Sequence, residues 1–319
     1  MRKDRLTRRI LSALGCGALL FVGGPAVTGS SASAPVEQPA STSAQDTINT
    51  VSLFSVEQRI SASFSSALRL IANPERNIRK RLEAVHRLSA TLDSQEIAGL
   101  YAFLKARPTQ EKNLAGMRYL KNEILTVLRT QSVAPANLAE LMIEISADAK
   151  QDLVTRDYAL QHLALWGVDQ AQQPGVTGKI QEAFKMRGQE TSSLAGTALL
   201  GLHRLTSPGQ TAPGREVSLL ALKMAGSSEM PIPARVTAIA ICSERGVAEV
   251  LPFVEALAQN EGPTSLRISA IGALGRLGGP KQRELLRGLE STVGGPAIRS
   301  ASAVALKRLD GTLASRGPF

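Results

Sequence analysis

A pattern of one basic, one small and two large apolar residues recurs along this chain at a nearly constant spacing. The clearest copy is Arg267 with Ala270, Leu274 and Leu277, whose offsets of 3, 7 and 10 fall on one stripe of a helix. Further copies begin at Arg81, Arg156, Arg235 and Arg299, and two weaker copies begin at Lys121 and at Ala195, which is not basic. In chain order the seven anchors are 40, 35, 39, 40, 32 and 32 residues apart. A repeat with this period predicts a solenoid in which each unit packs on its neighbours.

Helix start and stop signals agree with this period. A proline stands 3 or 4 positions before each of the last three arginines, and a glycine follows the end of each of those helices: Pro231, Pro263, Pro296, Gly246, Gly278 and Gly311. Asp93 and Glu96 predict a capping box that opens a second helix. Longer loops are predicted at residues 167–176 and 206–214, which are rich in Gln, Gly, Pro or Thr. Each unit is therefore predicted to be a helical hairpin.

The best copies also resemble a known family. Residues 263–278 and 296–311 share a proline, a Leu-Arg or Ile-Arg pair, and then small and leucine positions, and this order resembles HEAT repeats of the type shared with phycobilisome lyases. The resemblance covers residues 74–311. It implies an all-α fold, a right-handed α-solenoid of about seven HEAT-like helical hairpins with the last truncated as a cap, whose second helices line a concave binding surface. It does not imply an activity.

The N-terminus is typical of an export signal. Five basic residues within the first nine positions precede an apolar run at residues 10–22, which is too short for a membrane-spanning helix, and small residues follow. We predict a signal peptide at residues 1–34, a disordered Ser/Thr/Pro/Ala linker at 35–52, an N-terminal capping helix at 53–73 and the repeat domain at 74–319.

The mature chain is expected to begin between residues 27 and 35 and to be periplasmic or extracellular. An uncleaved membrane anchor is the alternative for this segment. Residues 7–11 (Thr-Arg-Arg-Ile-Leu) also resemble a twin-arginine export signal. Without residues 1–34 the chain keeps 32 basic and 26 acidic residues, and Cys242 is its only cysteine, so it cannot form an intramolecular disulfide. No membrane span is expected in the mature chain.

The repeated arginines are interpreted as structural. A residue found at one slot of several repeats is better explained by a contact made once per repeat than by a ligand site made once per protein. In this hypothesis each side chain lays its stem on apolar neighbours while its guanidinium reaches a carboxylate or the open carbonyls of a helix end. The residues concerned are Arg81, Arg156, Arg235, Arg267 and Arg299. Arg283, on a second helix, is expected to be exposed.

Residues typical of catalysis are scarce. His86, His162 and His203 stand at different offsets within their repeats, so no shared metal site is expected. Cys242 and Trp166 occupy core slots, which favours a buried thiol and a packed ring. The chain has no H-E-x-x-H, G-x-S-x-G or Cys-x-x-Cys motif. These observations predict that the chain is not an enzyme and uses no cofactor or metal.

Two functions from different classes remain. The first is an exported non-enzymatic scaffold in the cell envelope, expected to be monomeric, that binds a protein or peptide on its concave face. The alternative is a cationic protein that binds nucleic acid or another polyanion. Basic second helices alternate with helices that carry Glu140, Glu144, Glu249 and Glu255, which breaks any continuous basic stripe and makes nucleic acid the less expected partner. Partner contacts are predicted at Lys185, Arg187, Arg215 and Lys223, although an ordinary solvated helix face explains these residues as well.

Overall fold

A computed structural model describes residues 66–107, 114–170, 174–206, 212–291 and 295–311. The predicted signal peptide, the linker and residues 53–65 of the predicted capping helix lie outside these described residues. The remainder of that helix is α3, and the repeat domain from residue 74 onward follows it. All of the structure discussed below belongs to one compact unit of the chain, residues 52–315.

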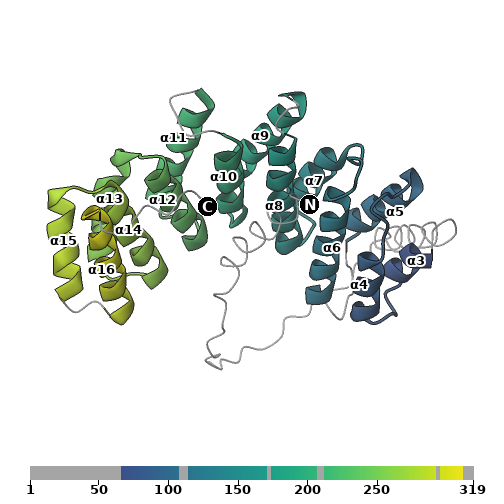
Figure 1. Cartoon of the computed structure of the whole chain (residues 1–319), viewed down its shortest axis with the longest axis horizontal. Helices are drawn as coiled ribbons and strands as arrows, with labels where there is room; N and C mark the ends of the chain where they lie inside the picture. The colour runs from purple at the N-terminus through teal and green to yellow at the C-terminus, as the bar shows by residue number, and fades with distance from the viewer. Residues whose placement is uncertain (1–65, 108–113, 171–173, 207–211, 292–294, 312–319) are drawn as a thin grey trace, which may run out of the picture. The chain divides into compact units, whose positions relative to one another are not determined.

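The described chain is all-helical, as the sequence predicted (Figure 1). The helices are α3 (Ser66–Ala72), α4 (Ile78–His86), α5 (Ser94–Lys105), α6 (Leu114–Arg129), α7 (Leu138–Ala147), α8 (Leu153–Asp169), α9 (Pro174–Gly188), α10 (Leu194–Leu205), α11 (Ala212–Gly226), α12 (Ile232–Glu244), α13 (Leu251–Gln259), α14 (Thr264–Leu277), α15 (Pro280–Ser291) and α16 (Pro296–Leu309), with one 3-10 turn, η1 (Ala248–Val250).

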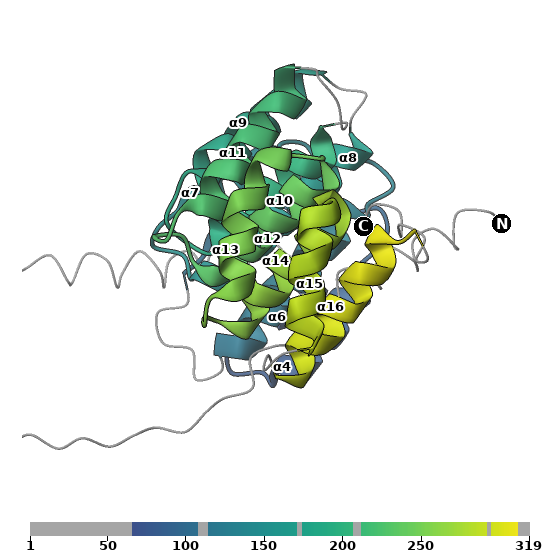
Figure 2. The same cartoon turned by 90° about the vertical axis from the view of Figure 1, so that its left-hand side faces the viewer.

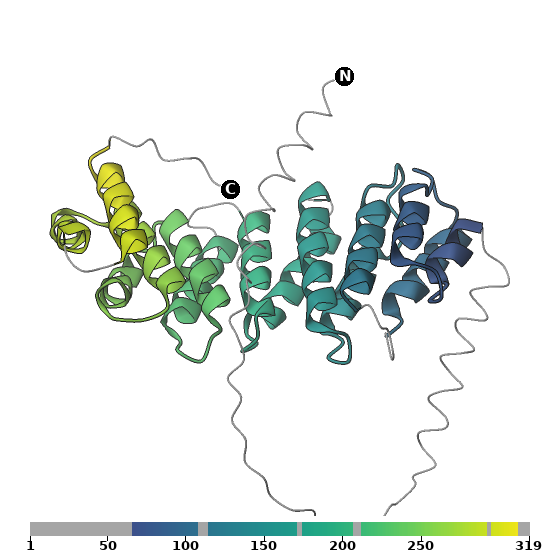
Figure 3. The same ribbon diagram turned by 90° about the horizontal axis from the view of Figure 1, so that it is seen from below.

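The helices form two layers that alternate along the chain (Figure 3). The first layer consists of α4, α6, α8, α10, α12, α14 and α16, and each of these helices packs against the next. These are the helices that contain the seven anchors of the sequence repeat. The second layer consists of α3, α5, α7, α9, α11, α13 and α15. Figure 2, which looks along the stack, shows α7, α9, α11 and α13 on one side of it. This is a HEAT-like α-solenoid.

The helices pair differently from the prediction, which joined each first-layer helix to the second-layer helix after it. Each second-layer helix packs mainly on the first-layer helix that follows it, so that α7 pairs with α8, α9 with α10 and α15 with α16. The leading helix α3 pairs in the same way with α4. Helix α16, the last helix that the structure describes, packs on both α14 and α15. The described chain therefore contains seven hairpins that begin with a second-layer helix.

The core follows the predicted apolar stripe. Ala270 and Leu274 of the clearest repeat are fully buried, and so are Ala159 and Leu163 of an earlier one. Trp166 is 7% exposed, which confirms the prediction that its ring packs in the core. Complete burial of one leucine side chain stabilises the fold by about 1.5 to 3 kcal/mol. The core is therefore a continuous row of residues supplied by every repeat.

Most of the predicted helix ends are confirmed. Asp93 and Glu96 form a capping box, with each side chain accepting from the backbone N–H of the other. Gly246 and Gly311 have φ values of 72° and 69°, the left-handed conformation expected after a helix. Gly278 differs, because its φ is −75°. A Cβ on Gly278 would lie 2.5 Å from the Leu274 carbonyl oxygen, so this position requires glycine for space.

The two predicted loops are shorter than the sequence suggested. Helix α8 continues to Asp169 and α9 begins at Pro174, so most of residues 167–176 is helical. Gly167 is a site of close packing within α8, where a Cβ would lie 2.8 Å from a methyl carbon of Leu205. Helix α11 begins at Ala212, inside the predicted loop 206–214. Glycine and proline favour loops, but proline is tolerated in the first turn of a helix and glycine where helices pack closely.

Candidate functional site

In five repeats the basic anchor residue reaches the end of the preceding second-layer helix. It donates to the carbonyl oxygen of the penultimate residue of that helix. The pairs are Arg81 Nε to Ile71 at 2.8 Å, Lys121 Nζ to Leu104 at 3.0 Å, Arg156 Nε to Ser146 at 2.9 Å, Arg235 Nε to Ala225 at 3.4 Å and Arg267 Nη2 to Ala258 at 3.2 Å. The anchor cation thus caps the C-terminus of the helix that packs on it.

This contact has a clear physical basis. The last carbonyls of a helix lack partners within it, and the helix dipole places partial negative charge there, which a cation stabilises. Arg81 and Lys121 are only 3% and 1% exposed, so these bonds are sheltered from water. The guanidinium of Arg81 also lies 5.8 Å from the centre of the Phe103 ring, and that of Arg235 lies 5.5 Å from the Phe253 ring. Arg299 is exposed on α16.

These contacts are of the kind expected of structural residues, and their contribution to stability remains a prediction.

Arg283, expected to be exposed, is instead partly buried. It donates to the Leu309 carbonyl oxygen at 3.3 Å and forms an ion pair with Asp310 at 2.9 Å. Arg283 therefore caps the end of α16 from α15. The sequence alone did not show this because residues 283 and 310 are brought together only by hairpin packing.

Lysines and glutamates pair between consecutive second-layer helices. The pairs are Lys105–Glu144 at 2.5 Å, Lys179–Glu140 at 2.9 Å, Lys185–Glu216 at 2.6 Å and Lys281–Glu255 at 2.8 Å. The hydrogen bond from Lys179 lowers the pKa of Glu140, and those from Lys281 and Gln282 lower the pKa of Glu255. The alternation of basic and acidic second helices seen in the sequence therefore corresponds to ion pairs between neighbouring repeats.

The four cations predicted to bind a partner do not form one free cluster. Lys185 pairs with Glu216, whose hydrogen bond raises the pKa of that lysine. Arg187 is half-buried and pairs with Glu190 at 2.5 Å. Arg215 and Lys223 are exposed on α11, and within the described part of the chain neither has a side-chain partner. Two of the four predicted residues are thus already neutralised within the protein.

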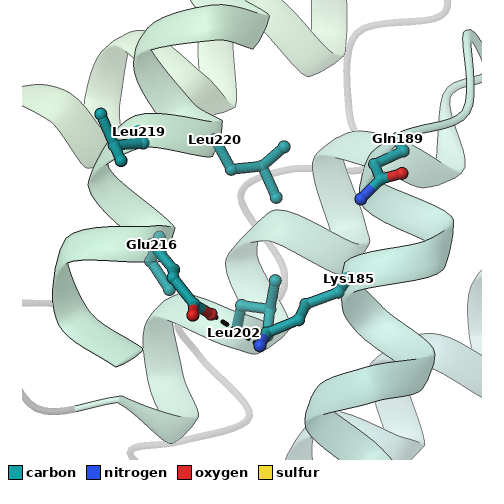
Figure 4. A pocket seen from close by; sticks show the side chains of 7 residues that line it. Lys185, Gln189, Leu202, Glu216, Leu219 and Leu220 are labelled. Atoms are coloured by element: carbon teal, nitrogen blue, oxygen red, sulfur yellow. Dashed lines mark ion pairs between the residues drawn. The ribbon is translucent and has the colours of Figure 1, made fainter. Parts of the chain in front are cut away.

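A groove of about 370 Å³ lies between α9 and α11. Figure 4 shows Leu220 directed from α11 toward α9, with the Lys185–Glu216 pair across the groove and Gln189 on the opposite wall. Leu202 of α10, only 2% exposed, contributes to the floor. Val217 completes the buried lining, whereas Leu219 is 58% exposed at its edge. Four of the seven lining residues are apolar; Leu202 and Val217 are buried, whereas Leu219 and Leu220 are accessible to solvent.

The sequence predicted residues near this groove but missed the groove itself. One signal was present in α11, where Leu219 stands four residues after Arg215 and four before Lys223. Residues four apart share one face of a helix, so this leucine interrupts an otherwise basic stripe. A large apolar residue on a charged face is more informative than the charges themselves. The groove could not be derived, because it depends on the separation of α9 from α11.

The histidines lie in three separate environments. His86 pairs with Glu123 at 3.2 Å and His203 with Glu244 at 3.0 Å. His162 contacts Asn122 Oδ1 at 3.1 Å, and burial together with the nearby Arg129 lowers its pKa to about 3. No group of three or more His, Cys, Asp and Glu side chains is suited to hold a metal ion within the ranges described above.

Cys242 is fully buried, as its core slot predicted. Burial, with a smaller contribution from the charge of Glu249, raises the pKa of its thiol to about 12. A thiol that remains protonated near neutral pH is a poor nucleophile. Cys242 therefore serves packing. The candidate functional site is the groove between α9 and α11.

Comparisons with known proteins add little beyond the fold. No protein-family model matches the chain, and no curated protein does. Among solved structures the chain is similar to human deoxyhypusine hydroxylase in complex with glycerol, with 14% sequence identity and a TM-score of 0.30. The match covers 82% of this chain and 99% of that one. At this score the match carries no argument about this chain, and no comparison supports the phycobilisome lyase type.

The same comparison corrects one expectation. The repeat architecture and the lack of catalytic motifs predicted that the chain is not an enzyme, whereas a solved structure that it resembles is that of a hydroxylase. A helical repeat fold therefore does not exclude an enzyme, and that prediction is overturned. At this identity and score the likeness assigns no activity to this chain.

Proposed function

We propose that this chain is an exported HEAT-like solenoid that binds a protein or peptide partner in the groove between α9 and α11. The observation that carries the proposal is the groove itself, about 370 Å³ of space lined by Leu202, Val217, Leu219 and Leu220. Binding sites are commonly concave and mostly apolar with a few polar groups. Lys185, Glu216 and Gln189 are the polar groups here.

Export is supported by the N-terminal residues. The five basic residues, the short apolar run and the small residues that follow are the parts of a secretory signal. The predicted segment lies outside the described residues. Within the described ranges, the helices are all too short or too polar to cross a membrane. N-terminal sequencing of the fractionated native protein is expected to find a start between residues 27 and 35, and an intact Met1 in the cytosol would contradict export.

The polyanion alternative draws less support from the charges. Lys179, Lys185 and Lys281 of the second layer are held by glutamates of neighbouring helices. A polyanion would have to compete with these carboxylates for each lysine, which reduces the counterion release that drives such binding. The basic excess is therefore partly used inside the fold.

Photo-crosslinking in the cell that produces the protein tests the function. Leu219 is replaced by p-benzoylphenylalanine in the full chain, and Val304, 41% exposed on α16, is replaced as the control. We expect one discrete crosslinked protein from position 219 and none from position 304. Adding Leu220→Asp should remove the product, because it places a charge in the groove. Equal products from both positions, or no effect of the added aspartate, would contradict the proposal.

A further inference from the structure

Helix α11 presents a basic and apolar stripe along the edge of the groove. Arg215, Leu219 and Lys223 are spaced by four residues, so their side chains lie on one face of the helix. Eight residues of helix separate the two cations by about 12 Å. Leu219 is 58% exposed between them and also lines the groove. The stripe therefore joins an apolar contact surface to two charges at a fixed spacing.

The charges near the groove leave this stripe positive. Lys185 and Glu216 neutralise each other across the groove at 2.6 Å. Glu182, the nearest carboxylate on α9, lies outside the groove lining and acts electrostatically on Lys185. Arg187 is held by Glu190. Within the residues that the structure describes, Arg215 and Lys223 are the cations of this site left available to a partner.

We infer that the groove binds an acidic, apolar peptide segment of another protein. Its apolar side chains fill the space among Leu202, Val217, Leu219 and Leu220, and its carboxylates pair with Arg215 and Lys223. This inference rests on the proposed function and adds the chemistry of the partner to it. Charge complementarity at the edge of an apolar site governs partner choice and association rate more than affinity.

Selection from a random 12-residue phage-displayed library on the immobilised full chain tests this chemistry. Selected peptides are synthesised with a fluorescent label, and their affinity is measured by fluorescence anisotropy. We expect enrichment of Asp or Glu on both sides of Leu, Ile or Phe. The double variant Arg215→Gln/Lys223→Gln should weaken binding by about three- to tenfold, as expected for charges at an exposed edge. Leu219→Asp should weaken it more than tenfold.

Arg287→Gln is the matched control, because Arg287 is an exposed cation on α15 of the same layer, away from the groove. It should leave the affinity unchanged, and circular dichroism with thermal unfolding verifies that each variant folds. A 12-residue single-stranded oligonucleotide is measured in parallel. If it binds and loses affinity in the Arg215/Lys223 variant, the partner is a polyanion and the inference is overturned.

The remaining outcomes separate this inference from the proposed function. Neutral or basic peptides that depend on Leu219 but not on Arg215 and Lys223 would overturn the acidic chemistry and leave peptide binding in the groove intact. A library that yields no binder, or only binders unaffected by Leu219→Asp, would overturn both. Acidic, apolar binders sensitive to the double variant and to Leu219→Asp support both.

Discussion

The two halves of the solenoid are packed through different layers. From α3 to α9, each second-layer helix packs against the next one in that layer. From α9 onward, within the described residues, direct contacts between consecutive second-layer helices are sparser, although ion pairs join α9 to α11 and α13 to α15, and η1 packs on α11. The first layer remains continuous throughout and is packed most closely where α14 meets α16. The groove lies between α9 and α11, at the first place along the chain where these direct contacts become sparse.

The buried residues of the first layer account for this difference. Those of α6 are large: Met117, Leu120, Lys121, Ile124, Leu125 and Leu128. Those of α10 and α14 include Gly196 and Gly275, where a Cβ would lie 3.0 Å and 2.7 Å from the Cα atoms of Ala234 and Ala305. Small residues allow helix axes to approach, because the distance between axes depends on the side chains at the contact. Close packing of first-layer helices thus accompanies sparser direct contacts between consecutive second-layer helices.

The anchor cations follow the same division. Lys121 in the N-terminal half is 1% exposed and donates to the carbonyl oxygens of Leu104 and Ala106 and to Gln151 Oε1. Arg267 in the C-terminal half is only partly buried and has one such bond at 3.2 Å. A cation whose head group is fully buried contributes more to folding stability, because water cannot replace its hydrogen bonds when the side chain is removed.

The largest expected effect is that of Lys121→Ala. It leaves two carbonyls at the end of α5 without their cation and creates a cavity, so we expect a loss of about 3 to 5 kcal/mol in the free energy of unfolding. Urea denaturation measures it. Lys80→Ala, at an exposed position of α4, is the control and should stay within about 0.5 kcal/mol. If the two variants were equally stable, the prediction that buried cations contribute more to stability than exposed ones would be wrong.

Arginine replacements extend this test to the C-terminal half. Arg267→Ala loses a charged hydrogen bond and stem packing, which should cost about 1.5 to 3 kcal/mol. Arg299→Ala, at the exposed end of the series, should cost about 0.5 kcal/mol or less. Arg287→Ala, at an exposed position of α15, is the surface control and should stay within about 0.5 kcal/mol. Chemical denaturation ranks the three variants, and lost peptide binding in a fully stable Arg267→Ala would assign this arginine to a site.

Acid should weaken the N-terminal half first. The pKa of His162 falls to about 3 in the folded chain, whereas the unfolded histidine titrates near 6.5. Between these values the unfolded state binds the extra proton, so stability rises with pH and is lost as the pH falls below about 6.5, by about 1.4 kcal/mol per pH unit. We expect the free energy of unfolding to fall by about 2 kcal/mol between pH 6.5 and pH 5.

His203 provides the internal comparison, since its partner is the carboxylate of Glu244 whereas that of His162 is the amide of Asn122. Denaturation at several pH values should give a flatter profile for His162→Gln than for the unchanged chain. Hydrogen exchange should locate the acid-sensitive opening at α6 and α8. An opening that begins at α14 and α16 would show that a different group controls the pH dependence.

Two glycines of α14 are expected to affect stability with opposite signs. Gly275→Ala places a methyl group 2.7 Å from the Ala305 Cα, so it should destabilise by about 1 to 3 kcal/mol as α16 is displaced. Gly272 has no atom within 4 Å of such a methyl group, and Gly272→Ala should stabilise by about 0.5 to 1 kcal/mol through helix propensity. Thermal unfolding distinguishes them. A stabilising Gly275→Ala would show that close first-layer packing is not required.

Sequence by itself determined the features that each repeat encodes locally. The period, the apolar stripe, the capping box at Asp93 and the left-handed glycines 246 and 311 depend on residues within one helix or its ends. The period and the stripe recur along the chain, and their agreement with the helix ends predicted the helical solenoid. The same local reasoning failed at Gly167 and Gly278, where glycine serves close packing and has no left-handed backbone role.

Only the tertiary structure decided which helices pair, where each cation finds its partner, and where a groove opens. Lys185 meets Glu216 across 31 residues of sequence, and Arg283 meets Asp310 across 27. Both contacts depend on the packing of second-layer helices on the first-layer helices that follow them. A sequence pattern records the charge and size of each side chain but not the distance between two helix axes. That distance depends on the summed volumes of side chains from different repeats.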